Sequence, residues 1–203
     1  HSFMRDVHYT TVGDVERDFV ELPSQINEHW AFEPEVLDIY AKHYKTGEPL
    51  PKELLAKYNA ASKYGQGFAT TEYLAASYVD MDLHVLTEVP ENSDVMQFEA
   101  QKLAERGIPR QIKPRYSVTN FSHTMEGGYT AGYYSYIWAE VLDADAFSVF
   151  KANGIFDKTT AQRFRDEVLS KGGTEHPMTL YKRFRGQEPT IDALLERNGI
   201  KNS

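Results

Sequence analysis

The longest stretch without glycine or proline, residues 68–89, most constrains what this chain can fold into. Within it, Tyr73, Ala76 and Val79 recur at intervals of three, which places them along one face of a helix. A strand would need alternation of apolar and polar residues instead. The pattern predicts a long helix over 68–86 with one buried side.

Similar spacing, interrupted by glycine and proline, recurs along the rest of the chain and predicts a mainly α fold with minor β. The minor β element is a strand-like stretch at 8–13, HYTTVG. Further helices are expected at 18–30, from Pro34 to near Gly47, from Pro51 to Gly65, and at 94–106, 129–150, 157–171, 177–185 and 190–198.

Composition excludes several classes of protein. A chain of 203 residues, 41% hydrophobic, suits one domain with a sizeable core. The net charge of -8 argues against nucleic acid as a partner, and no apolar run reaches the roughly 20 residues that span a bilayer. We therefore expect a soluble, cytoplasmic protein. Because cysteine is absent, a metal would need histidine and carboxylate ligands.

Glu21, in the run RDFVELPSQ, has two interpretations. Asp18 and Glu21 are three residues apart, the spacing of a capping box at a helix start. Alternatively, Glu21 is a metal ligand, which requires further ligands, and the chain contains no HExxH motif. Two helically spaced pairs offer only weak support for another metal site: His84 with Glu88, and His123 with Glu126.

A tyrosine-rich segment follows the longest predicted loop: FSHTMEGGYTAGYYSYIWAEV, residues 121–141. Tyr129, Tyr133 and Tyr136 stand at i, i+4 and i+7, so a helix would direct three phenols along one face. A phenol is protonated at neutral pH and can donate a hydrogen bond to an oxyanion formed from a peptide carbonyl. The segment is therefore a candidate oxyanion-binding element.

Three residues before this stripe fit the same interpretation. Gly127 and Gly128 would let the backbone approach or close over a substrate, and His123 would add a second donor. The alternative is an aromatic core stripe that follows a loop, because aromatic residues at helical spacing commonly pack inside a protein.

Several motifs in order resemble the thimet oligopeptidase and peptidyl-dipeptidase family, and they cover nearly the whole chain: RDFVELPSQ, EHW, FSH, GGYTAGYYSYIWAEV, FRDEVLSKGG and FRGQEP. The resemblance implies a mainly helical zincin fold with a narrow channel for short peptides, and one zinc ion. Glu21 then matches the third metal ligand. His123, Tyr129, Tyr133 and Tyr136 match substrate- and transition-state-binding positions, with Tyr136 the oxyanion donor, and Gly127 and Gly128 match a loop that closes over bound peptide.

In this family an HEFGH helix supplies two zinc-binding histidines and the glutamate base. His1 resembles the last histidine of the longer form HEFGHALH, so residues 1–203 are expected to be the C-terminal part of the catalytic domain, starting just after that helix. Such a fragment would be inactive alone, and its partners would be short peptides and the missing N-terminal portion of the same enzyme.

The segments DADAF, KGG and YKRFRGQEP resemble the bacterial members of the family. They favour a peptidyl-dipeptidase that releases C-terminal dipeptides, with an oligopeptidase A-like endopeptidase as the alternative. A non-catalytic helical interaction module is the rival class. Release of dipeptides requires a cation for the terminal carboxylate of the substrate, and the candidates are Arg115, Lys182 and Arg185.

Overall fold

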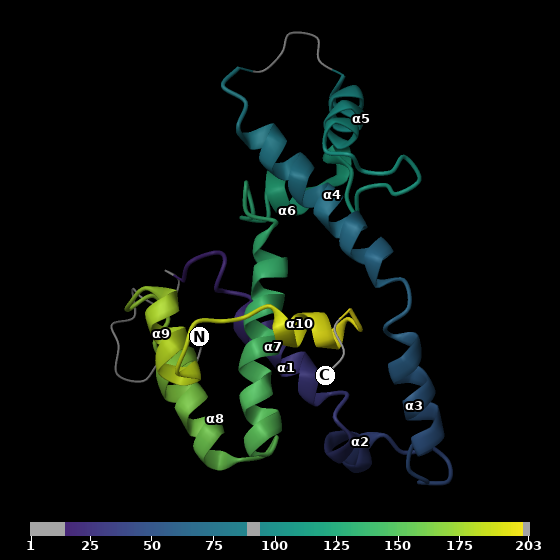
Figure 1. Cartoon of the computed structure of the whole chain (residues 1–203), viewed down its shortest axis with the longest axis vertical. Coiled ribbons are helices and arrows are strands. Elements are labelled where there is room, and N and C mark those ends of the chain that lie inside the picture. Colours follow the sequence, from purple (N-terminus) through teal and green to yellow (C-terminus); the bar gives the residue numbers. More distant parts are fainter. Residues whose placement is uncertain (1–14, 89–93, 201–203) are drawn as a thin grey trace. The chain divides into compact units, whose positions relative to one another are not determined.

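The computed structural model describes residues 15–88 and 94–200 and confirms a mainly α fold (Figure 1). Within these residues the β structure is an isolated antiparallel bridge between Lys42 and Pro49. The strand expected at 8–13 lies outside the described residues. The helices are α1 Leu22–Trp30, α2 Pro34–Tyr40, α3 Lys52–Ala61, α4 Gln66–His84, α5 Val95–Glu105, η2 Val118–Asn120, α6 Ser122–Met125, α7 Ser135–Asn153, α8 Lys158–Phe164, the wider-turned η3 Arg165–Leu169, α9 Pro177–Arg185 and α10 Asp192–Arg197.

The described residues form two compact units. Unit two is residues 65–136, and unit one is the described part of 1–64 and 137–203. The first two residues of α7 belong to unit two and the rest of that helix to unit one. No helix in 15–88 or 94–200 is both long and apolar enough to cross a membrane.

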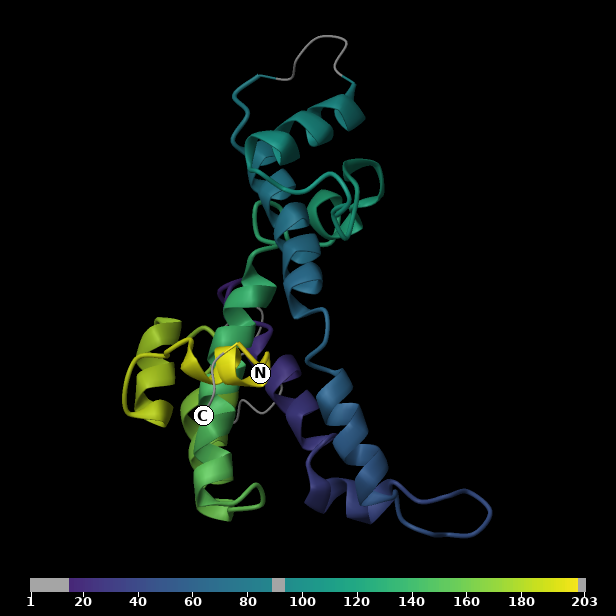
Figure 2. The same ribbon diagram turned by 45° about the vertical axis from the view of Figure 1, so that its right-hand side comes forward.

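The core of unit one forms where α1, α7, α8, η3 and α9 pack together. In both views α8 lies beside α7 after a short turn (Figures 1 and 2). Phe150 is 2% exposed and contacts the rings of Phe164 and Phe184, with centroids 5.9 and 6.0 Å away. Trp30, the last residue of α1, stands edge-on to Phe150 at 4.8 Å. This packing fixes α1 against α7 by its C-terminal end.

Unit two is built on the long helix α4, whose predicted buried stripe is confirmed. Ala76 and Val79 are buried and Tyr73 is half-buried. Val79 packs with Leu103 of α5 and with η2, whereas Ala76 packs with the aromatic residues described below. The two sides of the stripe therefore join α4 to α5 and to the tyrosine-rich segment.

The predicted capping box at Asp18 is wrong. The segment before Glu21 forms turns, in which the amides of Phe19 and Val20 donate to the carbonyl of Glu16, and α1 begins only at Leu22. Pro23 explains this start, because proline has no N–H and fits a helix only in its first turn. Glu21 itself occupies the N-cap position.

Candidate functional site

Glu21 is half-buried and its carboxylate is held by its own helix. The hydroxyl of Ser24, one turn on, donates to the Glu21 carboxylate at 2.6 Å and to its carbonyl oxygen at 2.9 Å. The sequence ELPS therefore starts the helix and orients the carboxylate at the same place. A carboxylate that ligates a metal is commonly oriented by a hydrogen bond of this kind.

The helix that follows Glu21 is firmly anchored in unit one. Leu22 and Ile26 are fully buried. The His29 ring stacks on Phe147 with centroids 4.6 Å apart, and its Nε2 lies 2.7 Å from a carboxylate oxygen of Asp143. These contacts fix the direction in which α1 presents Glu21.

The described residues fit one part of a zinc site. Catalytic zinc generally takes three protein ligands and a water molecule. Across 15–88 and 94–200 no three His, Cys, Asp or Glu side chains gather as a metal site would require, and HExxH is absent from the sequence. Glu21 is thus the single carboxylate that the motifs assign to a metal among the described residues, and its role as a ligand stays a prediction.

The two weaker pairs do not have the geometry that their spacing suggested. α4 ends at His84, so Glu88 lies beyond the helix and does not share a face with it. His123 is in the short helix α6, whereas Glu126 is the exposed residue that follows its end. The spacing assumed helices longer than those that form.

Four predicted site residues lie together in unit two. The His123 ring is 5.4 Å from the ring of Tyr133, 6.0 Å from that of Tyr136 and 6.1 Å from that of Tyr129, measured between centroids. Tyr129 and Tyr136 stack on each other at 4.9 Å. The structure thus gathers one imidazole and three phenols into a cluster, which we call the tyrosine cluster.

This cluster is not a stripe on one helix, and that part of the prediction is wrong. α7 begins at Ser135, so Tyr129 and Tyr133 precede it, in a turn. Gly128 and Ala131 have positive φ angles of 79° and 51°, which an α-helix cannot contain. The tyrosines converge because the chain folds back before the helix, not because of helical spacing.

The three tyrosines differ in burial. Tyr129 and Tyr133 are 8% and 3% exposed, whereas Tyr136 is half-buried. Burial raises the pKa of Tyr133 to about 12, partly offset by the positive charge of Arg115. Tyr73 stacks on Tyr133 and its hydroxyl donates to the Tyr133 carbonyl. Tyr133 therefore packs as the core interpretation expected, and Tyr136 is the most accessible phenol of the three.

His123 carries a polar atom that the surrounding protein leaves unsatisfied. Its Nδ1 is buried and has no hydrogen-bond partner among the described residues. The ring is enclosed by aromatic neighbours, including Tyr116 at 5.1 Å. A buried imidazole nitrogen without a protein partner suits hydrogen bonding to a bound molecule.

The glycine pair has a structural reason that spacing did not reveal. A Cβ on Gly127 would lie 2.9 Å from the Cα of His123 and 3.0 Å from its carbonyl oxygen, so only glycine fits against α6 there. Gly128 follows with a positive φ. Both residues are exposed, and they first of all allow the fold-back that brings Tyr129 to His123.

Asp80 of α4 belongs to this site and was not predicted. It is 1% exposed, and its two carboxylate oxygens accept the backbone N–H groups of Ala131 and Tyr133, each at 3.0 Å. His84, one turn on, places Nδ1 3.0 Å from the same carboxylate. The available signal was an aspartate directly after Val79 on the apolar side of α4, where a charged group needs partners.

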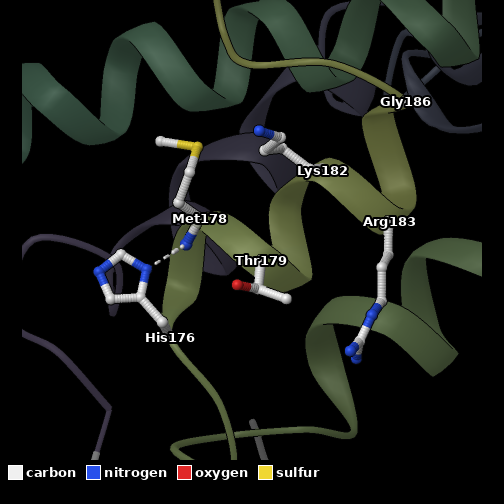
Figure 3. Close-up of a pocket in the computed structure, with 6 residues that line it drawn as sticks. All are labelled: His176, Met178, Thr179, Lys182, Arg183 and Gly186. Atoms are coloured by element: carbon white, nitrogen blue, oxygen red, sulfur yellow. Dashed lines mark hydrogen bonds between the residues drawn. The ribbon is translucent and has the colours of Figure 1, made fainter.

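Two of the three candidate carboxylate-binding cations already have acidic partners. Arg185 pairs with buried Asp145 through two contacts of 2.9 and 3.1 Å. Lys182 pairs with Glu188 at 3.1 Å, and it lines an open hollow on α9 (Figure 3). In Figure 3 the Lys182 and Arg183 side chains point in different directions, so the hollow does not concentrate their charges. The hollow is lined by His176, Met178, Thr179, Lys182, Arg183 and Gly186.

Arg115 is the candidate cation that adjoins the tyrosine cluster. It is exposed, and its guanidinium lies 6.0 Å from the centre of the Tyr116 ring. Its charge lowers the pKa of Tyr133 against the larger effect of burial. It remains a candidate for binding an anion.

Comparisons with known proteins confirm the family that the sequence motifs resemble. The model of peptidase family M3 matches residues 1–200, so the chain belongs to that family. It is 47% identical over 191 residues to oligopeptidase A of Escherichia coli (strain K12). This match covers 94% of this chain and 28% of that protein.

Other relatives carry different names. The chain is 39% identical over 203 residues to dipeptidyl carboxypeptidase of Salmonella typhimurium, covering 98% of this chain and 30% of that protein. It is 30% identical over 200 residues to saccharolysin of Saccharomyces cerevisiae, and this match covers 98% of this chain and 28% of saccharolysin. The chain thus spans less than a third of the length of these relatives.

Proposed function

We propose that this chain supplies part of the catalytic region of a zinc metallopeptidase that cleaves short peptides. The observation that carries the proposal is the tyrosine cluster, because it joins hydrogen-bond donors from His123 and Tyr136 in a chain that belongs to family M3. The proposed partners are short peptides and the part of the enzyme that bears HExxH. A relative in Arabidopsis thaliana is named a probable cytosolic oligopeptidase A, which supports a cytoplasmic location.

Each residue has a distinct role in the proposed reaction. Glu21 would be one carboxylate ligand of zinc, oriented by Ser24. When bound, zinc supplies Lewis-acid polarisation and an activated water. Tyr136 donates its phenolic proton in a hydrogen bond to the carbonyl oxygen as negative charge develops there. His123 is assigned to substrate binding within the tyrosine cluster, and Gly127 and Gly128 form the turn beside it.

Between the two activities, identity favours internal cleavage of oligopeptides. Identity is 47%, 46% and 41% to three bacterial enzymes named oligopeptidase A, and 39% and 40% to two named dipeptidyl carboxypeptidase. The pairing of Lys182 and Arg185 with acidic residues supports the same choice, because it reduces the three candidate cations for a terminal carboxylate to one, Arg115. We therefore propose an oligopeptidase, with dipeptide release as the second activity to assay.

The test uses the longer protein in which this chain follows an HExxH segment. Glu21→Gln should abolish stoichiometric zinc binding, and Tyr136→Phe should lower kcat by about 10²–10³ because one oxyanion donor is lost. Tyr134→Phe is the matched control, since Tyr134 is exposed and lies two residues before Tyr136 in sequence. Full zinc content in Glu21→Gln, or normal kcat in Tyr136→Phe, would overturn the corresponding role.

One pair of substrates distinguishes internal cleavage from the release of C-terminal dipeptides. A peptide with a free C-terminus and its C-terminal amide should be cleaved at similar rates by an oligopeptidase, at internal bonds identified by mass spectrometry. Loss of cleavage in the amide, with a dipeptide as the product from the free acid, would instead establish the peptidyl-dipeptidase activity. In that case Arg115→Ala should raise KM for the free acid.

A further inference from the structure

Asp80 makes a contact whose partners all belong to the tyrosine-rich segment or to its own helix. One carboxylate oxygen accepts the N–H of Ala131 and the other accepts the N–H of Tyr133, each at 3.0 Å. The two amides flank Gly132, so the carboxylate closes over a single residue of the turn. The segment lies 51 and 53 residues away in sequence, so only the tertiary fold brings the two parts together.

The backbone of this turn requires such support. Ala131 has a φ of 51°, and in the described ranges it is the sole residue other than glycine with a positive φ. A residue with a Cβ is disfavoured in the left-handed region, so the surrounding structure must compensate. The hydrogen bond from the Ala131 amide to a buried carboxylate is charge-assisted and stronger than one to a neutral acceptor.

The hydrogen bonds between Asp80 and the turn also stabilise the buried carboxylate. Asp80 is 1% exposed, and an ionised group at that depth is costly without hydrogen bonds. Two backbone N–H groups donate to it, and the His84 Nδ1, which is hydrogen-bonded to the Asp80 carbonyl oxygen at 2.8 Å, lies 3.0 Å from it. A well-satisfied buried carboxylate is rigid, so it can hold the turn in one position.

We propose that Asp80 is a positioning residue that sets the arrangement of the tyrosine cluster. The turn it holds joins Tyr129 to Tyr133 and ends two residues before α7, which carries Tyr136 in its first turn. Releasing the Ala131 and Tyr133 amides frees the backbone between the stacked rings of Tyr129 and Tyr136. The catalytic consequence rests on the proposed function, whereas the structural role does not.

The first experiment tests the structural role in the 203-residue chain. Amide hydrogen exchange and ring-to-ring nuclear Overhauser effects are compared in the wild type, Asp80→Asn and Asp80→Ala. In Asp80→Ala, exchange at Ala131 and Tyr133 should accelerate at least tenfold and the Overhauser effects between the His123 and Tyr136 rings should weaken. Asp80→Asn, which keeps one acceptor oxygen, should fall between. Unchanged Overhauser effects in folded Asp80→Ala would overturn the proposal.

Asp82→Asn is the matched control. Asp82 is also buried on α4, but its carboxylate pairs with Arg106 and not with the turn. Its substitution should leave the exchange of Ala131 and Tyr133 and the Overhauser effects as in the wild type. Equal changes in Asp82→Asn would mean that any damage to α4 loosens the turn, and they would contradict a specific role for Asp80.

The second experiment measures kinetics in the longer enzyme that contains HExxH. Asp80→Ala should lower kcat at least tenfold with KM within twofold, because binding surfaces remain and only the alignment of donors changes. Normal kcat in Asp80→Ala, where Tyr136→Phe is impaired, would refute the positioning role. Normal kcat in Tyr136→Phe would refute the proposed function instead, and the exchange and Overhauser results would still decide whether Asp80 sets the cluster.

Discussion

Asp145 in unit one and Asp80 in unit two are both almost fully buried on long helices, but they have different partners. Asp145 of α7 accepts hydrogen bonds from Arg185 and from the Tyr181 hydroxyl, both on α9. Asp80 of α4 instead accepts two backbone N–H groups from a turn. One carboxylate joins helix to helix, and the other holds an irregular segment.

This difference explains how the candidate site residues are held in place in each unit. Unit one is held by regular packing, and its candidate residue, Glu21, is oriented by contacts within its own helix end. Unit two places its candidate residues in and beside a turn with positive φ angles, which local sequence alone does not stabilise. A distant carboxylate therefore holds the backbone of the site directly in unit two, whereas in unit one Asp143 acts on the helix that follows Glu21 through the His29 ring.

The largest expected effect concerns Asp145. Asp145→Ala would leave the Arg185 guanidinium without its acceptor and the buried Tyr181 hydroxyl with the longer contact to the Leu142 carbonyl, and should lower the free energy of unfolding by about 3 kcal/mol. Urea unfolding followed by tryptophan fluorescence measures this, because both tryptophans, Trp30 and Trp138, lie in unit one. Glu188→Ala, which removes an exposed partner of Lys182, should change it by less than about 0.5 kcal/mol. An equal loss of unfolding free energy in both variants would contradict the role of the buried Asp145 carboxylate in joining α7 to α9.

A smaller effect is expected at the strained turn. Ala131→Val places a β-branched side chain at a φ of 51° and should destabilise unit two by about 1–2 kcal/mol. Ala131→Gly, which tolerates this angle, should stay within about 1 kcal/mol of the wild type. Hydrogen exchange of the α4 amides measures both changes. If valine were tolerated as well as glycine, the turn would not be the strained element that Asp80 compensates.

The smallest expected effect is a dependence on alkaline pH. The pKa of Tyr133 is about 12 in the folded protein and near 10 when unfolded, so between these values the unfolded chain binds fewer protons. The stability should therefore fall as pH rises from about 10 to 12, and Tyr133→Phe should show a weaker fall. Thermal melts by circular dichroism at pH 9 and 11 measure this difference. Burial also raises the pKa of Tyr181, but that contribution is common to both proteins and cancels. Parallel curves would contradict the burial of Tyr133.

Helix positions were largely predictable because their signals are local. Helices were expected to begin at Asp94 and Asp157, and there these two residues cap α5 and α8 by accepting the N–H groups of Met96 and Thr160 at 2.9 and 2.6 Å. The same reasoning failed at Asp18, where Pro23 moved the helix start to Leu22. It failed again at 129–134, where spacing predicted a helix and the chain forms a turn.

Sequence by itself determined the helical character, the family motifs and the identity of the candidate residues, including Glu21, His123 and Tyr136. The roles of these residues stay predictions. The three-dimensional structure was needed to show that a turn brings the tyrosine rings to the His123 ring and that Gly127 packs against α6. It was also needed to show that the Asp80 carboxylate accepts hydrogen bonds from the turn. The physical reason is that caps and helical faces depend on residues three or four apart, whereas a buried carboxylate finds its partners across about fifty residues of chain, where no local pattern reaches.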